Sequence, residues 1–222
     1  MAFSSATTKF SNMDDITLAS LGPHGPPQKI PTGHLCHFTG MAIQAPKMTI
    51  AWDTRPQQPL SGQGKPMCKL PLTIREDDPE HLAFMHTLMK LDERAKAFVV
   101  ANKDKLVPKG KKKFDIDDVF TNSVRKNNEK YPPVFLSKGD FDGDELNYNI
   151  KPAIYNPDGS NYEDILGRTN EALLKGNEIL AVVRPEYIWA INGRFGITWK
   201  LVRAVLTNEG ANLENSFDFD LN

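Results

Sequence analysis

The 222-residue sequence has little of what marks several large classes of protein. Its two cysteines, Cys36 and Cys68, are too few for a disulfide framework, which favours a reducing compartment. No apolar run approaches the roughly 18 residues of a membrane-spanning helix, and the first residues lack the basic and apolar regions of a signal peptide. We therefore expect a soluble, intracellular protein that does not contact a membrane.

Signatures of catalysis and of metal binding are also missing. The sequence contains no P-loop, no G-x-S-x-G elbow and no HExxH pair. The acidic run 140–145 resembles a calcium loop, but its glycine comes fourth instead of sixth and Lys151 stands at the twelfth position. His34, Cys36 and His37 lie close together without a second ligand pair at zinc spacing. We expect no enzyme activity, no cofactor and no metal.

The charge is almost balanced, with a formal net charge of −1, so a binding site for a polyanion requires local segregation of charge. Residues 103–113 supply such a segregation, with six lysines against a single aspartate. Residues 209–222 carry only acidic charges. We interpret Lys111, Lys112 and Lys113 as a basic loop that contacts nucleic acid; the alternative is a solvated loop.

The order of elements predicts a mainly β protein with one long helix, an α+β fold. Strands are expected at 48–52, 67–74, 134–137, 148–155 and 179–183. A helix begins at Asp77 or Asp78, with Pro79 in its first turn, and its apolar residues recur at helical spacing to about Asn102. A second, short helix is expected at 116–124. Short strands without a βαβ rhythm predict a small antiparallel β-barrel with the long helix inserted.

Asn192-Gly193 predicts a two-residue hairpin, because both residues accept the positive φ of a type I′ turn. This register pairs Trp189 with Gly196 and Tyr187 with Thr198. One face then carries aromatic rings, cations and small residues, a combination suited to stacked bases and phosphates: Tyr187, Trp189, Ile191, Arg194, Gly196, Thr198 and Lys200. The other face is apolar and forms a wall of the core: Ile188, Ala190, Phe195, Ile197, Trp199 and Leu201.

Two alternatives remain open for the hairpin. Tyr187 and Trp189 could pack under the long helix, and a slip of one residue would instead expose Phe195 and Trp199. Further candidates lie outside this face. Arg184 and Arg203 flank the hairpin, and Trp52 and Lys69 on earlier strands would extend the binding track.

Several short patterns resemble one known family. They are the ILAVV run at 179–183, Arg184-Pro185 and Trp189, the NGRFGITWKLV segment at 192–202, the LPLTI strand at 70–74, the segment 130–138 with its YPPVFLSK sequence, and the acidic aromatic tail. Together they resemble OB-fold single-stranded-DNA-binding proteins of large DNA viruses and phages. The resemblance implies a barrel groove that holds single-stranded DNA and a tail that contacts replication proteins such as a polymerase, helicase or primase. The implied tail residues are Glu214, Phe217, Asp218, Phe219 and Asp220.

These observations divide the chain into three parts. Residues 1–38, rich in Ser, Thr, Gly and Pro, are expected to be disordered. Residues 39–206 form an OB-like binding domain with a helix at about 78–102 and a basic loop at 103–113. Residues 207–222 form a flexible acidic tail.

We expect a protein that binds single-stranded DNA without sequence specificity in viral-type DNA replication or recombination, at a viral replication site in the nucleus or cytoplasm of the host. Single-stranded RNA binding and a non-catalytic structural or interaction role in the virion are the alternatives. The sequence is compatible with a homodimer.

Overall fold

The computed structural model describes residues 7–9, 23, 25–38, 41–54, 56–57, 67–108, 114–126, 128–143, 148–150, 153–156 and 174–207. The structure is mainly β with a few helices, as the sequence predicted. Its two longest strands, β13 (Glu178–Ile191) and β14 (Arg194–Leu206), form a hairpin. Asn192 and Gly193 have φ values of 52° and 73°, which confirms the predicted turn.

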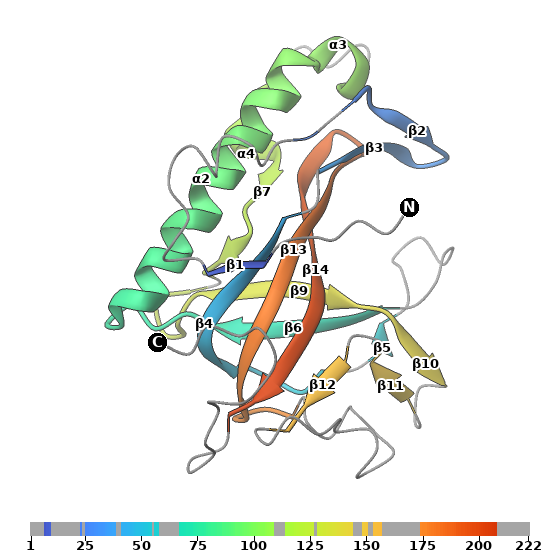
Figure 1. The fold of residues 1–222 in the computed structure, drawn as a ribbon. Helices are drawn as coiled ribbons and strands as arrows, with labels where there is room; N and C mark the ends of the chain where they lie inside the picture. Colours follow the sequence, from blue (N-terminus) through green and yellow to red (C-terminus); the bar gives the residue numbers. More distant parts are fainter. Residues whose placement is uncertain are drawn as a thin grey trace.

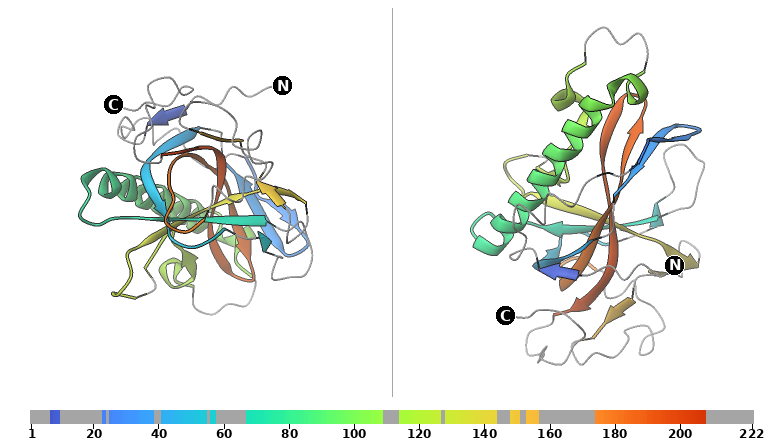
Figure 2. Two further views of the ribbon diagram at one scale, coloured as in Figure 1. Left: turned by 90° about the horizontal axis from the view of Figure 1, so that it is seen from below. Right: turned by 45° about the horizontal axis from the view of Figure 1, so that its top comes forward.

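The pairings of the hairpin close a ring of five strands. β4 (Ala42–Ile50) pairs with β6 (Met67–Thr73), and β6 pairs with β9 (Val134–Gly139). β9 pairs with β14, β14 with β13, and β13 with β4. The left view of Figure 2 shows the hairpin and β4 curving around a common centre.

One pairing in this ring differs from the expected antiparallel order, because β9 and β14 are parallel. β13 lies between them in sequence and runs opposite to β14, so β14 returns in the direction of β9. β4 is also longer than the expected strand 48–52, since it begins at Ala42.

The segment 1–38 is not uniformly without structure, contrary to our expectation. β2 (Gln28–Ile30) and β3 (Gly33–His37) form a hairpin, and β3 pairs with β13 from Gly33 to His37. The prolines that suggested disorder flank these strands instead of interrupting them, because Pro26 and Pro27 precede β2 and Pro31 lies in the turn. A three-residue strand, β1 (Thr7–Lys9), also pairs with β4.

The long helix α2 (Pro79–Ala101) starts where the sequence placed it. The Asp78 side chain caps the helix by accepting hydrogen bonds from the backbone N–H groups of Glu80 and His81, at 2.9 and 3.4 Å. Figure 1 shows α2 running along one side of the strands, with α3 (Lys103–Leu106) beyond its end.

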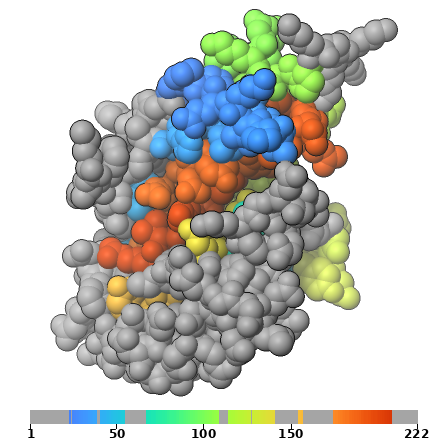
Figure 3. Space-filling view, turned by 90° about the vertical axis from the view of Figure 1, so that its right-hand side faces the viewer, coloured from blue at the N-terminus to red at the C-terminus, as the bar shows by residue number. Residues whose placement is uncertain are grey.

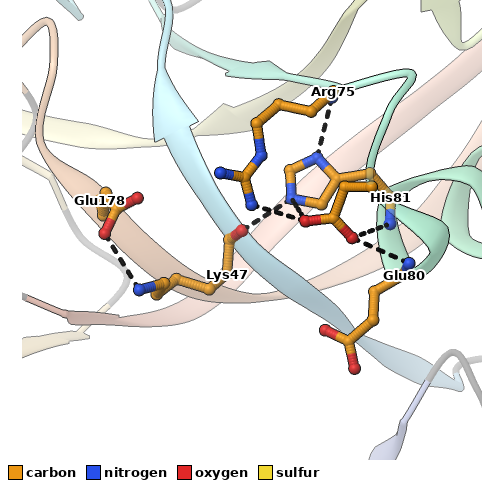
Figure 4. Close-up of polar contacts among 6 residues, drawn as sticks. Lys47, Arg75, Glu80, His81 and Glu178 are labelled. Atoms are coloured by element: carbon orange, nitrogen blue, oxygen red, sulfur yellow. Dashed lines mark hydrogen bonds and ion pairs between the residues drawn. The ribbon is translucent and has the colours of Figure 1, made fainter.

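His81 fastens the first turn of α2 to the ring (Figure 4). Its Nδ1 accepts from the backbone N–H of Arg75 at 3.0 Å, and its Nε2 lies 2.9 Å from the carbonyl oxygen of Lys47 on β4. Because an N–H can only donate and a carbonyl can only accept, the imidazole carries its proton on Nε2.

The shorter elements correct two expectations. The helix expected at 116–124 ends early as α4 (Ile116–Val119), and the chain continues as β7 (Phe120–Thr121) and β8 (Val124–Arg125). The strand expected at 148–155 is two strands, β11 (Tyr148–Ile150), which pairs with β10 (Phe141–Gly143), and β12 (Ala153–Tyr155). β5 (Pro56–Gln57) pairs with the first residues of β6 in an antiparallel arrangement.

The core fills the ring and continues beneath α2. In one cluster Phe84, Leu88 and Leu91 of α2 pack with Phe135 and Trp199. A second cluster joins Ala95 and Val99 of α2 to Ile188, Ala190 and Phe195 of the hairpin. The helix therefore covers the apolar face of the hairpin, and the register predicted from the sequence is confirmed.

A buried hydrogen-bonded chain holds helix and hairpin together. The Trp199 indole N–H donates to Ser123 Oγ at 2.7 Å, and Ser123 donates through Oγ and its backbone N–H to Asp92 on α2, at 2.7 and 2.8 Å. Burial raises the pKa of the Asp92 carboxyl to about 6, against the lowering effect of the Ser123 hydrogen bonds.

Candidate nucleic-acid interface

The face of the hairpin that points away from α2 carries Tyr187, Trp189 and Arg194. Each lies opposite a small or apolar partner, since Tyr187 pairs with Thr198, Trp189 with Gly196 and Ile191 with Arg194. Tyr187 and Trp189 are half-buried and Arg194 is exposed, and neither ring belongs to the clusters beneath α2. The alternative that these rings pack under the long helix is therefore wrong.

Trp189 lies across the backbone of Gly196. A methyl group built on Gly196 would stand 2.7 Å from Cζ2 and 3.0 Å from Cε2 of the indole, and 3.0 Å from the backbone oxygen of Thr121 on β7. The absence of a side chain at Gly196 thus creates the space in which the indole lies over β14. On the other side, Leu35 of β3 pairs with Trp189.

Tyr187 forms a second aromatic position next to Trp189. The ring of His37 on β3 meets the ring of Tyr187 edge-on, with 5.8 Å between the ring centroids. Partial burial raises the pKa of the Tyr187 hydroxyl above its ordinary value, so this ring is neutral at pH 7. The face therefore offers two flat, uncharged aromatic rings on one strand, with an imidazole beside them.

A β-bulge in β13 changes which cations share this face. The register shifts between Pro185 and Tyr187, so that Arg184 lies opposite Lys200. Because residues directly opposite one another project from the same face of a sheet, Arg184 joins Lys200 on the outer face. The alternation of an unbroken strand would have placed Arg184 on the inner face, so the sequence predicted a position outside the binding face for this residue.

Lys200 is the cation that the sequence favoured together with Arg194, and it is already paired. Its Nζ lies 3.2 Å from Asp140 Oδ2 and 3.7 Å from Glu186 Oε1. Glu186 is the residue of the bulge, which aims its carboxylate towards Lys200. A phosphate that approaches Lys200 therefore competes with two carboxylates.

The row of cations continues onto two further strands. Lys200 pairs with Lys138 of β9, and Lys138 pairs with Lys69 of β6. The pKa of the Lys138 ammonium is lowered by its burial, then by the positive charges of Lys69 and Arg125, against a raising effect of Glu186.

Sequence reasoning missed Lys138 and Arg125. The alternation of inward and outward side chains along β9 was the signal for Lys138. Phe135 and Ser137 are buried, so Lys138, the next residue, points outwards. Arg125 carried no such signal, since the sequence predicted a helix at 116–124 and no strand at β8.

The other candidates are spread more widely. Arg203 is half-buried on β14 opposite Val182 and next to β12, and Trp52 is 42% exposed just beyond the end of β4. Lys111, Lys112 and Lys113 lie outside the described residues. The same holds for the five tail residues, Glu214, Phe217, Asp218, Phe219 and Asp220.

No metal site accompanies these residues in the part of the chain that the structure describes, where no three His, Cys, Asp or Glu side chains group as ligands. Cys36 and Cys68 are buried, and burial raises their pKa values to about 11 and 12. Both thiols are therefore protonated at neutral pH and poor as ligands or nucleophiles.

The candidate face lies on the side of the molecule opposite α2. Figure 3 views this side: atoms of the hairpin (orange), of β2 and β3 (blue) and of β9 (yellow) lie beside one another at the surface. The aromatic end of the face is near β3, and the row of cations crosses the hairpin towards β9.

Comparison with known proteins gives matches only at the level of structure. No protein-family model matches the chain, and no curated protein matches it in sequence. Among the solved structures, a single-stranded-DNA-binding protein of bacteriophage Enc34 in complex with single-stranded DNA matches with a TM-score of 0.44 and 14% identity, over 85% of this chain and 96% of that one. The single-stranded-DNA-binding protein gp2.5 of bacteriophage T7 matches with a TM-score of 0.47 and 16% identity, over 81% and 98%.

Among the described residues, no helix is both long and apolar enough to span a membrane. Both matched structures are phage single-stranded-DNA-binding proteins, the group that the sequence patterns resemble.

Proposed function

We propose that this protein binds single-stranded DNA on the outer face of the β13–β14 hairpin. The observation that carries the proposal is the position of Tyr187 and Trp189. Both rings lie on the face away from α2, half-exposed, with Arg184, Arg194 and Lys200 on the same face. The apolar residues of the opposite face already supply the core, so the core does not require the rings on this face.

The chemistry of the face matches that of an unpaired strand. Exposed bases stack on aromatic rings, and each such contact contributes roughly 1–3 kcal/mol with little dependence on the base. Cations beside the rings attract the phosphates, with an affinity that falls as salt rises. We infer from this combination that binding does not depend on sequence. In this proposal the closed ring of five strands is the OB-like barrel that the sequence predicted, with β14 parallel to β9 as its irregular feature.

The proposed binding domain is larger than the predicted domain of residues 39–206. It ends near residue 206, as expected, but it begins before residue 39, since β2 and β3 pair with the hairpin. The basic residues Lys111, Lys112 and Lys113 remain a predicted contact beside the domain. Residues 207–222 remain a predicted acidic tail that binds a replication protein.

In this proposal the protein coats unwound DNA during phage or viral replication or recombination, inside the infected cell. It performs no turnover and needs no cofactor. Partners such as a polymerase, helicase or primase would bind the tail, and a homodimer is compatible with the proposal.

The test is a titration of fluorescently labelled oligonucleotides followed by anisotropy, at about 50 and 200 mM salt. The ligands are oligo(dT), a mixed-sequence single strand, the matching duplex and the matching RNA. We expect both DNA single strands to bind alike, more tightly than the duplex, and more weakly at the higher salt. A clear preference for RNA would favour the RNA-binding alternative. A preference for duplex would reject the single-strand proposal, and no binding at low salt would reject it and favour an interaction protein.

A further inference from the structure

We propose that Lys69, Lys138 and Arg125 form a phosphate-binding subsite that carries single-stranded DNA off the hairpin and across β9 and β6. The inference rests on the proposed function and adds a site and a direction to it. The strand would cross the β-strands from the aromatic rings of β13 to Lys69, instead of following the length of the hairpin.

The register of four neighbouring strands supports this path. Arg184 on β13, Lys200 on β14, Lys138 on β9 and Lys69 on β6 follow one another as paired residues. Paired residues lie side by side, and neighbouring strands are about 4.8 Å apart, so the row spans about 14 Å. Arg125 reaches the same face, because it pairs with Val134, which lies on the Lys138 side of β9.

The row is not charged evenly along its length. Lys200 is held between Asp140 and Glu186, within 4 Å of both. In the described part of the chain, Lys69, Lys138 and Arg125 form no ion pair. Among the described residues, carboxylates therefore neutralise Lys200 more than they neutralise Lys138 or Lys69, which leaves these two lysines better able to bind a phosphate.

The cluster also costs the fold free energy. Lys69 and Lys138 are half-buried beside one another, and like charges in a partly desolvated position repel. The lowered pKa of Lys138 has this cause, after its burial. A polyanion that lies across the row removes this repulsion between the lysines. The relief of the repulsion therefore adds to the binding free energy. A merely structural role predicts the reverse, since removing a structural lysine would weaken the fold.

The experiment compares Lys138→Gln, Lys69→Gln and Arg125→Gln with the matched control Lys47→Gln. Lys47 is an exposed lysine on β4, paired with Glu178 at 3.1 Å, and its contact with His81 uses only its backbone carbonyl. For each full-length variant, oligo(dT) affinity is measured across a series of salt concentrations and the melting temperature by circular dichroism.

We expect each subsite variant to bind roughly fivefold more weakly at about 50 mM salt and to lower the slope of log K against log salt by about 0.7, as the loss of one contact to a single strand requires. Lys138→Gln should also raise the melting temperature. Lys47→Gln should change neither quantity.

If the unmodified protein binds oligo(dT) and the three subsite variants match Lys47→Gln, the subsite is wrong and the hairpin proposal stands. If the unmodified protein does not bind oligo(dT), both are wrong. A titration with poly-glutamate separates a second ligand class: if Lys138→Gln weakens binding of poly-glutamate but not of oligo(dT), the cluster binds an acidic peptide and the phosphate subsite is rejected.

Discussion

The indole of Trp189 lies over the backbone of Gly196 on the neighbouring strand, so close that a methyl group on Gly196 would approach Cζ2 to 2.7 Å. This contact positions the ring on the outer face of the hairpin without burying it in the core. It also makes the position of the ring sensitive to a single methyl group at Gly196.

Replacing Gly196 by Ala should therefore move the indole and weaken binding of single-stranded DNA. Trp189→Ala should cost roughly 1–3 kcal/mol of binding free energy with little change in the salt slope, because stacking releases no counterion. The measurement is oligo(dT) anisotropy for Gly196→Ala, Trp189→Ala and the double variant.

The double variant tests whether Gly196 affects binding through the Trp189 ring. If Gly196 acts through the ring, Gly196→Ala should have a much smaller effect once Trp189 is already Ala. Equal effects in both backgrounds would contradict the coupling. If Trp189→Ala abolishes cooperative unfolding, the ring belongs to the core and not to a binding face.

The two cations of the hairpin should differ in their effect on salt dependence. Arg194 is exposed, so Arg194→Gln should lower the slope by about 0.7. Lys200→Gln should lower it less, because Asp140 and Glu186 already neutralise part of the Lys200 charge. A salt titration of both variants decides this, and a larger change for Lys200→Gln would show that its ion pairs open freely when DNA binds.

The buried contacts among Trp199, Ser123 and Asp92 should contribute to stability and not to binding. Ser123→Ala leaves the Trp199 N–H and the Asp92 carboxylate short of a partner, and should lower the free energy of unfolding by about 1–3 kcal/mol. The measurement is urea unfolding. Oligo(dT) affinity of the folded variant should match that of the unmodified protein, and a selective loss of affinity would contradict this assignment.

Asp92 also predicts a pH dependence. Its pKa is raised to about 6, so its contribution to stability is full below about pH 4 and is lost as the pH rises to about 6. The rise of the Asp92 pKa from 3.8 to about 6 corresponds to roughly 3 kcal/mol of unfolding free energy. The unfolding free energy of the unmodified protein, measured relative to Asp92→Asn, should therefore fall between pH 4 and 6 and stay constant above that range. A flat difference would show that burial does not perturb Asp92.

The cap of α2 should show the opposite dependence. Asp78→Ala should cost about 0.5–2 kcal/mol at pH 7 by removing the bonds to Glu80 and His81. Burial alone would raise the pKa of Asp78, but the hydrogen bonds from His81 and Glu80 hold it below its ordinary value. The cap therefore stabilises the fold above the pKa of the unfolded chain and is lost as the pH falls through the folded value. Urea unfolding should show the cost of Asp78→Ala shrinking in acid; a constant cost would reject this role.

Deleting residues 209–222 tests the expected tail. An acidic strand with aromatic residues can compete with DNA for a cationic face, so the deletion should tighten oligo(dT) binding, most at low salt where screening is weakest. The deleted protein should unfold like the full chain. Unchanged affinity at low salt would reject competition between the tail and DNA, and would leave partner binding as the one expected role of the tail.

The sequence by itself determined the local features of this protein. Asn192 and Gly193 determined the turn, and therefore which residues face each other in the hairpin. Asp78 and Pro79 determined the start of α2. Each of these depends on the conformational preference or hydrogen bonds of neighbouring residues, which act before any distant contact forms.

Only the tertiary structure decided how distant strands combine. Strand pairing brings Lys69, Lys138 and Lys200 into one row, although about 70 and 60 residues separate successive members in sequence. The bulge at Glu186 adds Arg184 to that row and pairs Lys200 with acids, which alternation along an unbroken strand could not indicate. The pairing of β3 with β13 likewise gave structure to a segment whose prolines suggested none. The physical reason is that backbone hydrogen bonds between strands are indifferent to sequence separation, so the charge environment of each cation is fixed only when the ring of strands closes.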